Sequence, residues 1–447
     1  MSLPLSGVRI VEMGQLIAIP HCMKLLGDMG AQVIRIETCS RLDNYRLQSI
    51  YGNNADGDYW DRAANFYEQN RNKMSLTLDL TDETCLSALK DLISVSDVFA
   101  ENFTPRVMRN FGLEYEDLRK IRPDIIMVSS TGYGYVGPWS DFGAIGFTTE
   151  AASGLASITG YRDGPPTLPE IPYADYTAAE HTAFAVMAAL VHRANTGEGQ
   201  FIDVSQSETL TSTIPEAMMD FTVNGRTQGR IGNEHPSISP HGCYPCAGED
   251  SWIAISAATD EQWLSLCSAM HKDEWAEDVR FEDAATRVKN RTDVDSVLSA
   301  ATGSWDAHQL MRCLQDVGVA AGAVLNGKQL LFDPHLKARG FYETVEHDDN
   351  TGMPPLPYSS RPWKFSRTPG GPYTAAPTLG RHNRLVLAEH LGLSNDAISR
   401  LEESGVVGQR PSNVTPPRFL PLDEQLDRGL IISYEDDYRQ QLRSQYD

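Results

Sequence analysis

Residues 168–204 of the chain read LPEIPYADYTAAEHTAFAVMAALVHRANTGEGQFIDV. Small and apolar residues occupy nearly every face of segment 178–190, and this pattern predicts a helix that is buried all round. The turn signal Asn195-Thr196-Gly197 ends the predicted helix, and residues 200–204 are typical of a short strand. An acid, Asp175, stands just before the first apolar position, where the N-cap of a helix is expected.

Two roles are open to Asp175. As a helix cap it would contribute about 1 kcal/mol to stability, and its presence would need no other explanation. As a carboxylate nucleophile it would benefit from the same free N–H groups, because a helix N-terminus favours negative charge. The two roles are compatible, and the residues around Asp175 have to decide between them.

The first part of the chain alternates strands with helices, which predicts a parallel, helix-flanked sheet of the α/β class. Strand patterns lie at 8–13, 32–37, 75–79, 97–100 and 124–129, and helical spacing lies at 16–29, 82–94 and 113–121. The first turn, MGQLIAIP, lacks G-x-G-x-x-G, so a dinucleotide fingerprint is absent. Ligands of such sheets bind at the carboxyl ends of the strands. The candidate binding loops are therefore 15–20, 38–46, 101–109 and 130–137.

Composition excludes several classes of protein. The chain of 447 residues carries 60 acids against 38 Lys and Arg, a net charge of −22 that disfavours nucleic acid and anionic membranes. No apolar run approaches the ~18 residues that span a bilayer, and no signal peptide is evident. Seven cysteines suit a reducing cytoplasm. The motif Cys243-Tyr244-Pro245-Cys246 has no second pair at zinc spacing, so a packing turn is expected there and no metal site.

The run IPYADYTAAEHTAFAVMAALVHRANTGEGQFIDVSQSE, which contains R-x-x-T-G-x-G-Q, resembles the signature of the class III CoA-transferase family, the family of formyl-CoA transferase and carnitine CoA-transferase. The resemblance extends over residues 3–394. It implies that Asp175 is the catalytic aspartate, so that capping becomes a second role and no longer a competing one. It also implies a dimer of two chains interlinked like rings.

The same resemblance implies a CoA site at the loops that follow the strands. Glu101-Asn102-Phe103-Thr104-Pro105 is similar to the family's E-N-F/Y-x-P turn, and residues 131–134 are similar to its x-G-Y/F-x loop. Where relatives often carry a basic residue and an arginine, this chain has Thr38 and Asn110, so Arg41 and Arg109 are expected to take the phosphate contacts. The implied CoA-binding residues are Ile17, Ala18, Arg41, Leu78, Thr81, Asn102, Phe103, Thr104, Arg109, Thr131, Gly132 and Tyr133.

The expected organisation is a discontinuous, Rossmann-like large domain and a smaller α+β domain. We expect the large domain at 1–224 and 333–394, the small domain at 225–332, and an acidic C-terminal tail at 395–447. Residues 203–224 are expected to be helical. In the small domain we expect a strand at 251–257 and helices near 260–271 and 308–317.

The implied activity is transfer of CoA from an acyl-CoA donor to a carboxylic acid through an aspartyl anhydride and an aspartyl-CoA thioester. CoA thioesters would be substrates, with no permanently bound cofactor, and the enzyme would be a cytoplasmic homodimer or a hetero-oligomer with a related chain. Oxyanion stabilisation is expected from loop 130–137 or turn 15–18.

Two alternatives stay open. An α-methylacyl-CoA racemase would need a second acid or base, generally a histidine, in segment 143–154. That segment reads GAIGFTTEAASG, with Ile145 at the matching position and Glu150 as its one acid. The other alternative is a structural subunit of a two-chain CoA-transferase, which the presence of Asp175 argues against.

Overall fold

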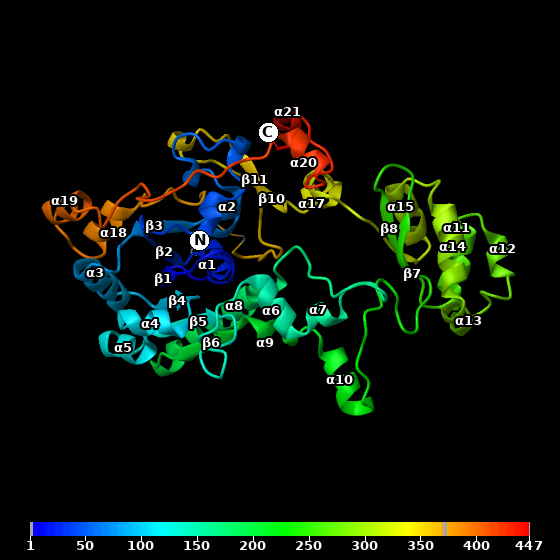
Figure 1. Ribbon diagram of the computed structural model, residues 1–447, viewed down its shortest axis with the longest axis horizontal. Coiled ribbons are helices and arrows are strands. Elements are labelled where there is room, and N and C mark those ends of the chain that lie inside the picture. Colours follow the sequence, from blue (N-terminus) through cyan, green and yellow to red (C-terminus); the bar gives the residue numbers. More distant parts are fainter. Residues whose placement is uncertain (1–2, 369, 371–372, 447) are drawn as a thin grey trace. The chain divides into compact units, whose positions relative to one another are not determined.

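The computed structural model describes residues 3–368, 370 and 373–446, and the chain forms two compact units (Figure 1). The first unit takes the chain up to Leu155, then Pro169–Pro215, then the chain from Lys337 onward. The second unit takes Ala156–Leu168 and Glu216–Leu336. Segment 156–168 therefore belongs to the second unit, and residues 395–446 belong to the first unit instead of standing apart as a tail.

A six-stranded parallel sheet forms the centre of the first unit, which confirms the predicted α/β class. The strand order is β3-β2-β1-β4-β5-β6, so the direction of winding reverses between β1 and β4, the point at which such sheets bind ligands. The strands are β1 (Arg9–Met13), β2 (Gln32–Glu37), β3 (Lys73–Thr77), β4 (Val98–Glu101), β5 (Ile126–Thr131) and β6 (Phe201–Ser205).

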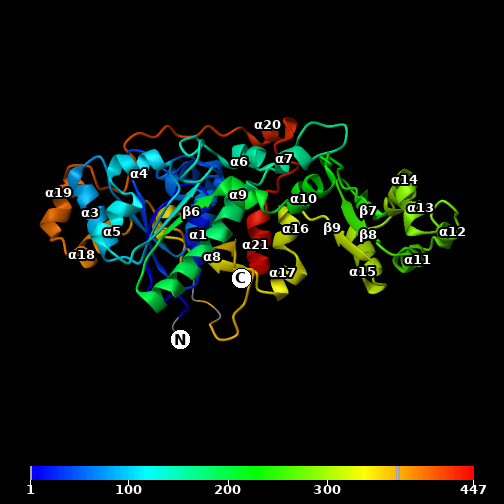
Figure 2. The same cartoon turned by 90° about the horizontal axis from the view of Figure 1, so that it is seen from below.

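Helices cover both faces of this sheet because its side chains are apolar on both sides, as expected of a parallel sheet. On one face, Ile10, Val98 and Val128 pack against helices α1 (Ala18–Asp28) and α8 (Tyr173–Thr196), which run beside each other in Figure 2. The other face packs against α3 (Glu83–Ser94), α4 (Pro105–Phe111), α5 (Tyr115–Ile121), α18 (Asn383–Glu389) and α19 (Asn395–Glu403). Two separate apolar cores therefore hold the sheet.

The last residues of the first unit are part of its core. Ile398 of α19 and Val407 are fully buried, or nearly so, against the sheet. The backbone N–H of Asp79 donates to the carbonyl of Val406, and Thr77 Oγ1 donates to the carbonyl of Gly408. Residues 395–408 thus close the edge of the sheet beside β3.

Shorter elements complete the first unit. They are α2 (Ala64–Asn70), α6 (Gly146–Ser153), α9 (Gln206–Thr211), α20 (Leu422–Asp427), α21 (Tyr438–Tyr446), the antiparallel pair β10 (Tyr342–Val345) and β11 (Leu356–Ser359), and the single turns η1 (Asn44–Leu47), η2 (Tyr51–Asn53), η3 (Tyr59–Asp61) and η4 (Asp349–Thr351). Two further helices, α7 (Leu155–Ile158) and α17 (Pro334–Ala338), each lie across a boundary between the units.

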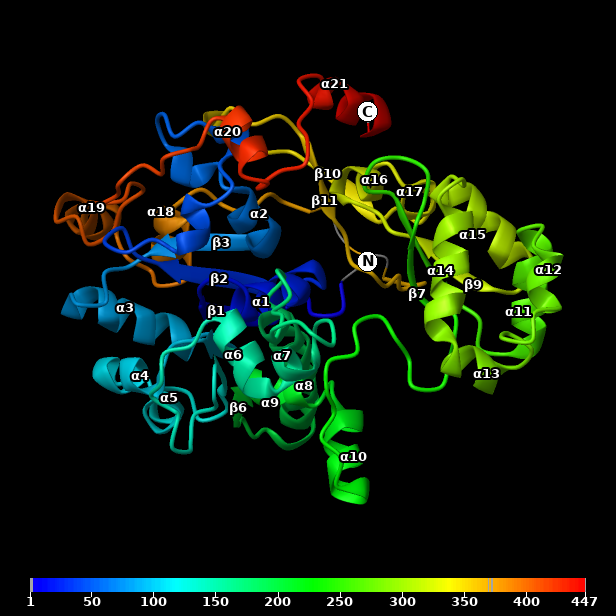
Figure 3. The same ribbon diagram turned by 45° about the vertical axis from the view of Figure 1, so that its right-hand side comes forward.

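The second unit has its own antiparallel sheet, of order β7-β8-β9, and its own apolar core around Trp263 and Leu298. Figure 3 shows α14 and α15 beside this sheet. Its elements are β7 (His241–Pro245), β8 (Trp252–Ser256), β9 (Ala320–Ala323), α10 (Pro215–Asn224), α11 (Asp260–Ala269), α12 (Asp273–Ala276), α13 (Ala284–Lys289), α14 (Arg291–Thr302), α15 (Ala307–Asp316) and α16 (Gly327–Leu331).

Two local predictions are wrong. Helix α8 is not buried all round, because Phe184 and Val191 are 78% and 62% exposed within the chain. Segment 203–224 is not one helix, since β6 continues to Ser205 and the chain then forms α9 and α10 separately. In the described part of the chain, no helix combines the length and the apolar character that a membrane crossing requires.

Candidate active site

Helix α8 begins earlier than the sequence pattern indicates, and the prediction that Asp175 is its N-cap is wrong. Pro172 occupies the N-cap position and offers no side-chain acceptor, so Asp175 is the third residue of the helix. The cap is supplied from another element, because Glu150 Oε1 on α6 accepts a hydrogen bond of 2.6 Å from the backbone N–H of Tyr173. The Asp175 carboxylate is therefore free of a capping role on its own helix.

The Asp175 carboxylate lies where the N-termini of α1, α6 and α8 meet. It accepts a hydrogen bond from the backbone N–H of Ala18, the first residue of α1. Gly146, the first residue of α6, approaches so closely that a Cβ there would lie 2.5 Å from Asp175 Oδ2. Helix N-termini carry partial positive charge, so this position favours a carboxylate.

Burial opposes that preference. Asp175 is 8% exposed, and burial raises its pKa to about 6, while the Ala18 N–H acts to lower the pKa and the charge of Glu150 acts to raise it. A carboxylate with this pKa is ionised at neutral pH yet more basic than an ordinary aspartate. It is thus suited to nucleophilic attack.

The turn before α1 is held in a strained conformation beside Asp175. Leu16 has φ of 61°, which is uncommon for a residue other than glycine. Asn102 fixes this turn from the next loop, with its Oδ1 2.8 Å from the Gln15 N–H and its Nδ2 2.9 Å from the Gln15 carbonyl oxygen. Asp43 Oδ2 accepts the N–H of Leu16 at 3.0 Å. These bonds set the position of the Ala18 amide that Asp175 uses.

A small cavity of about 160 Å³ opens onto Asp175. Its walls come from the carboxyl ends of β1, β4 and β5 and from the segment that enters α6. Gly132 is required there, since a Cβ would lie 2.2 Å from the Cβ of Ala144. The lining residues are Gln15, Leu16, Asn102, Phe103, Thr104, Thr131, Gly132, Phe142, Ala144, Ile145, Gly146, Asp175 and Gln206. Among these described residues there is no histidine to act as a second base.

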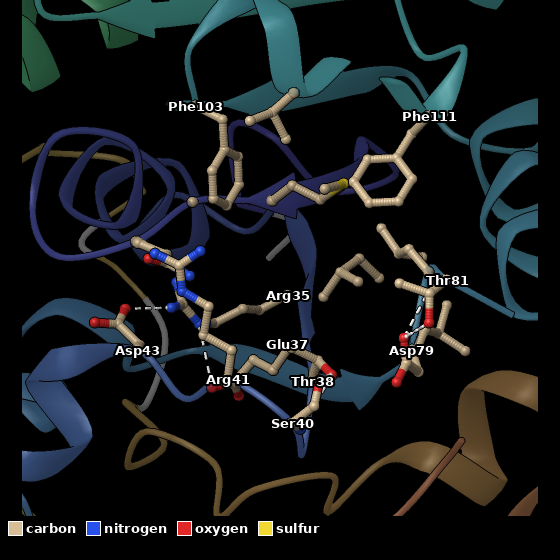
Figure 4. Close-up of a pocket in the computed structure, with 17 residues that line it drawn as sticks. Arg35, Glu37, Thr38, Ser40, Arg41, Asp43, Asp79, Thr81, Phe103 and Phe111 are labelled. Carbon is tan, nitrogen blue, oxygen red and sulfur yellow. Dashed lines mark hydrogen bonds and ion pairs between the residues drawn. The ribbon is translucent and has the colours of Figure 1, made fainter. Parts of the chain in front are cut away.

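A larger cavity of about 330 Å³ adjoins the first one and shares Gln15 and Phe103 with it. Phe103 and Phe111 stand on one side of this cavity in Figure 4, with Thr38 and Ser40 on the opposite side. The lining residues are Met13, Gly14, Gln15, Arg35, Ile36, Glu37, Thr38, Ser40, Arg41, Asp43, Leu78, Asp79, Leu80, Thr81, Phe103, Val107 and Phe111.

A network of buried charges supports the floor of the larger cavity. Arg35 is 2.5 Å from Glu12 Oε1 and 2.6 Å from Asp43 Oδ2, and Arg46 binds both oxygens of Glu37 at 2.8 Å. Burial opposes ionisation of Glu37, but Arg46 outweighs it and brings the Glu37 pKa down to about 2. Asp43 also accepts the Leu16 N–H, so the network links the larger cavity to the turn before α1 that lies beside Asp175.

The structure brings most of the sequence-predicted residues to these two cavities. Asn102, Phe103, Thr104, Thr131 and Gly132 line the cavity of Asp175, and Arg41, Leu78 and Thr81 line the larger one. Ile17 and Ala18 are buried at the start of α1.

Four of the predicted residues, Ile17, Ala18, Tyr133 and Arg109, line neither cavity. Tyr133 packs against the rings of Trp139 and Phe142, while Arg109 forms an exposed ion pair of 3.2 Å with Asp141. Sequence reasoning also missed Arg35, Asp43 and Gly146, and gave Glu150 no role in the site. A charged residue inside the buried strand QVIRIE was the one available signal for Arg35.

Taken together, the fold and the site define an α/β enzyme with a buried carboxylate in a cleft at the switch point of its sheet. The family model described as CoA-transferase family III matches residues 5–383. The chain is 33% identical to the succinyl-CoA–D-citramalate CoA-transferase of Chloroflexus aurantiacus, covering 90% of this chain and 98% of that protein. It is also 33% identical to the succinate–glutarate CoA-transferase of Agrobacterium fabrum, covering 86% and 95%.

A solved structure has the same fold. The crystal structure of a CAIB/BAIF family protein from Brucella suis superimposes with a TM-score of 0.79 at 29% identity, covering 87% of this chain and 100% of that one. The chain belongs to CoA-transferase family III. It is therefore a transferase that uses CoA thioesters as substrates.

Proposed function

We propose that the chain moves CoA from an acyl-CoA donor to a carboxylic acid, with Asp175 as the nucleophile. The observation that carries this proposal is the buried Asp175 carboxylate, which opens into a cavity and is held by the Ala18 amide. A residue with no task beyond helix stability would gain nothing from a position in which its pKa is raised to about 6.

The reaction would proceed by four exchanges at carbonyl carbon. An oxygen of Asp175 attacks the donor thioester, the C–S bond breaks, and a mixed anhydride and CoA thiolate form. The thiolate attacks the aspartyl carbonyl, which releases the donor acid as a carboxylate and leaves aspartyl-CoA. The acceptor carboxylate then attacks the aspartyl carbon of aspartyl-CoA, the C–S bond breaks, and a second anhydride and CoA thiolate form. The thiolate attacks the acyl carbon that came from the acceptor, and Asp175 leaves as a carboxylate. The products are the new acyl-CoA and the free Asp175 carboxylate.

The Ala18 amide has a specific role in this scheme. In the second and third exchanges the attacked carbon is that of Asp175, so negative charge develops on an aspartyl oxygen. The Ala18 N–H already donates to this carboxylate in the free enzyme. Because the amide is fixed by the turn that Asn102 and Asp43 hold, it can stabilise the oxyanion without reorganisation.

The two adjoining cavities suggest how CoA would lie. The larger cavity offers the rings of Phe103 and Phe111 and the cation of Arg41, which suit the adenine ring and the phosphates of the nucleotide. The smaller cavity would take the thioester end against Asp175. Arg41 is the better candidate for a phosphate contact, since Arg109 is paired with Asp141 outside both cavities.

We infer that the acids exchanged are dicarboxylates. Support comes from the relatives, whose names pair succinyl-CoA or succinate with citramalate or glutarate. A panel of dicarboxylic and monocarboxylic acids, offered with succinyl-CoA and analysed by mass, tests this substrate class. Product formation only with monocarboxylic acids would contradict it.

The substitution Asp175→Asn tests the mechanism. The amide is a poor nucleophile, so we expect nearly complete loss of turnover with folding intact. Wild-type protein incubated with succinyl-CoA and then hydroxylamine should carry a hydroxamate on the Asp175 peptide, because anhydrides and thioesters both acylate hydroxylamine. Near-normal turnover by correctly folded Asp175→Asn protein would refute the nucleophilic role.

A further inference from the structure

We propose, building on the nucleophilic role of Asp175 proposed above, that Glu150 is a positioning residue for that nucleophile. Its carboxylate fixes the first turn of α8, and its negative charge disfavours the free Asp175 carboxylate relative to the acylated one.

The position of Glu150 carries the first half of this proposal. Pro172 provides no side-chain cap, so the orphan amides of the first turn of α8 need an acceptor from elsewhere. Glu150 accepts from Tyr173 at 2.6 Å and also from the N–H of Ala174. These are the two residues that directly precede Asp175, so Glu150 fixes the position of the backbone that carries the nucleophile.

Helix α6 faces Asp175 along one side. Gly146 and Glu150 are four residues apart and share a face of α6. Gly146 is in contact range of Asp175 Oδ2, and Glu150 binds the backbone just before Asp175. Glu150 is fully buried, and in the described part of the chain its second oxygen, Oε2, has no hydrogen-bond partner.

The charge of Glu150 carries the second half. Two carboxylates repel each other where water is excluded, and this repulsion raises the Asp175 pKa in addition to the larger effect of burial. When the Asp175 oxygen attacks the thioester, its negative charge passes to the departing CoA sulfur and the anhydride is neutral. The repulsion is then relieved, so Glu150 favours the covalent intermediate over the free carboxylate.

The other titratable groups around Asp175 are neutral near pH 7 or remote. Burial raises the pKa values of Tyr45 on η1 and Tyr176 on α8, so both phenols stay protonated. On α1, burial lowers the pKa of His21 to about 3, which leaves it uncharged.

The remaining charged groups are screened or paired. Asp43, which lies near Tyr45, is paired with Arg35, and Lys24 of α1 is paired with Glu68. Glu208 of α9 is exposed to water. Within the described residues, Glu150 is therefore the acid whose charge acts on Asp175.

The substitution E150Q separates charge from shape. Glutamine keeps a side-chain oxygen for the Tyr173 and Ala174 amides but has no charge. Incubated with succinyl-CoA alone, E150Q should form the hydroxylamine-trappable acyl-enzyme about three- to tenfold more slowly at pH 7.5. The acidic limb of its pH–rate profile should move to lower pH by about half a unit or more. Its thermal midpoint should stay close to that of the wild type.

The matched control is E282Q, the same substitution at an exposed position of the second unit, which should keep the wild-type rate and the wild-type acidic limb of the pH–rate profile. If E150Q does not fold, E150D is the second variant, because it keeps the charge but places it farther from Asp175. The acidic limb of its pH–rate profile should move to lower pH by a smaller amount. An unchanged limb and rate in a folded variant would overturn the inference while leaving the nucleophilic role intact. A wild type that succinyl-CoA and hydroxylamine do not label would overturn both.

Discussion

Asp175 illustrates how one residue combines reactivity with a cost in stability. Its pKa is about 6 in the folded chain against 3.8 for an ordinary aspartate, so the folded state binds this proton more tightly than the unfolded state. Below about pH 4 the group is protonated in both states and has no effect. Between about pH 4 and pH 6 the unfolded state ionises first, and stability falls as the pH rises. Above pH 6 the loss is complete, at about 3 kcal/mol.

Asp175→Asn should therefore be more stable than the wild type at neutral pH. We expect the difference in unfolding free energy between the two proteins to grow by about 2 kcal/mol from pH 4.5 to pH 7.5, since asparagine does not ionise. Guanidinium unfolding of both proteins at the two pH values measures this difference. A difference in unfolding free energy that is the same at both pH values would show that ionisation of Asp175 does not destabilise the folded state.

At the scale of elements, the site depends on a close approach of α6 to α8. The first residue of α6, Gly146, leaves no space for a side chain, because a Cβ would lie 2.5 Å from Asp175 Oδ2 and 2.5 Å from the Pro172 Cβ. At the neighbouring Gly143, by contrast, an added Cβ would have no atom within 4 Å. These two glycines therefore provide a matched pair of variants in one loop.

Gly146→Ala should displace the Asp175 carboxylate and lower kcat by about tenfold or more, because a shift of the nucleophile of about 1 Å is costly. CoA affinity should change little, since most of the CoA molecule would lie in the larger cavity. Gly143→Ala should behave as the wild type in steady-state assays. Equal rates for both variants would mean that the approach of α6 does not position Asp175.

At the scale of the whole molecule, the chain leaves the first unit and returns to it more than once, and α8 carries an uncovered apolar stripe at Phe184, Ala188 and Val191. Contiguous apolar residues on a surface helix commonly mark an interface. Together with the family resemblance, this stripe supports the prediction of a dimer.

We predict a dimer in sedimentation velocity at micromolar concentration. Phe184→Glu should weaken the dimer at least about tenfold, because a charge would then be buried at the interface. Val279→Glu, at an isolated exposed position of the second unit, is the control and should leave sedimentation unchanged. A wild type that sediments as a monomer would refute the prediction.

The repeating patterns of the chain were sufficient to predict the architecture of the sheet. Strand β2 was predicted with both of its ends correct, and α3, predicted at 82–94, runs from Glu83 to Ser94 with Asp82 as its N-cap. The reason is physical: a parallel sheet needs apolar strands and amphipathic helices, and both leave a local periodicity. Asp175 and the loops around Asn102 and Thr131 were found through motif resemblance, and the structure brings them to one cavity.

Only the tertiary structure revealed the groups that act across long sequence separations. Glu150 caps a helix that begins 23 residues later, and Asn102 holds a turn 87 residues earlier. Neither relation has a local period, so no window of sequence could contain it. The exposed stripe on α8 was missed for a related reason. Apolar composition indicates that a surface is to be covered, but whether its own sheet or another chain covers it depends on the packing in three dimensions.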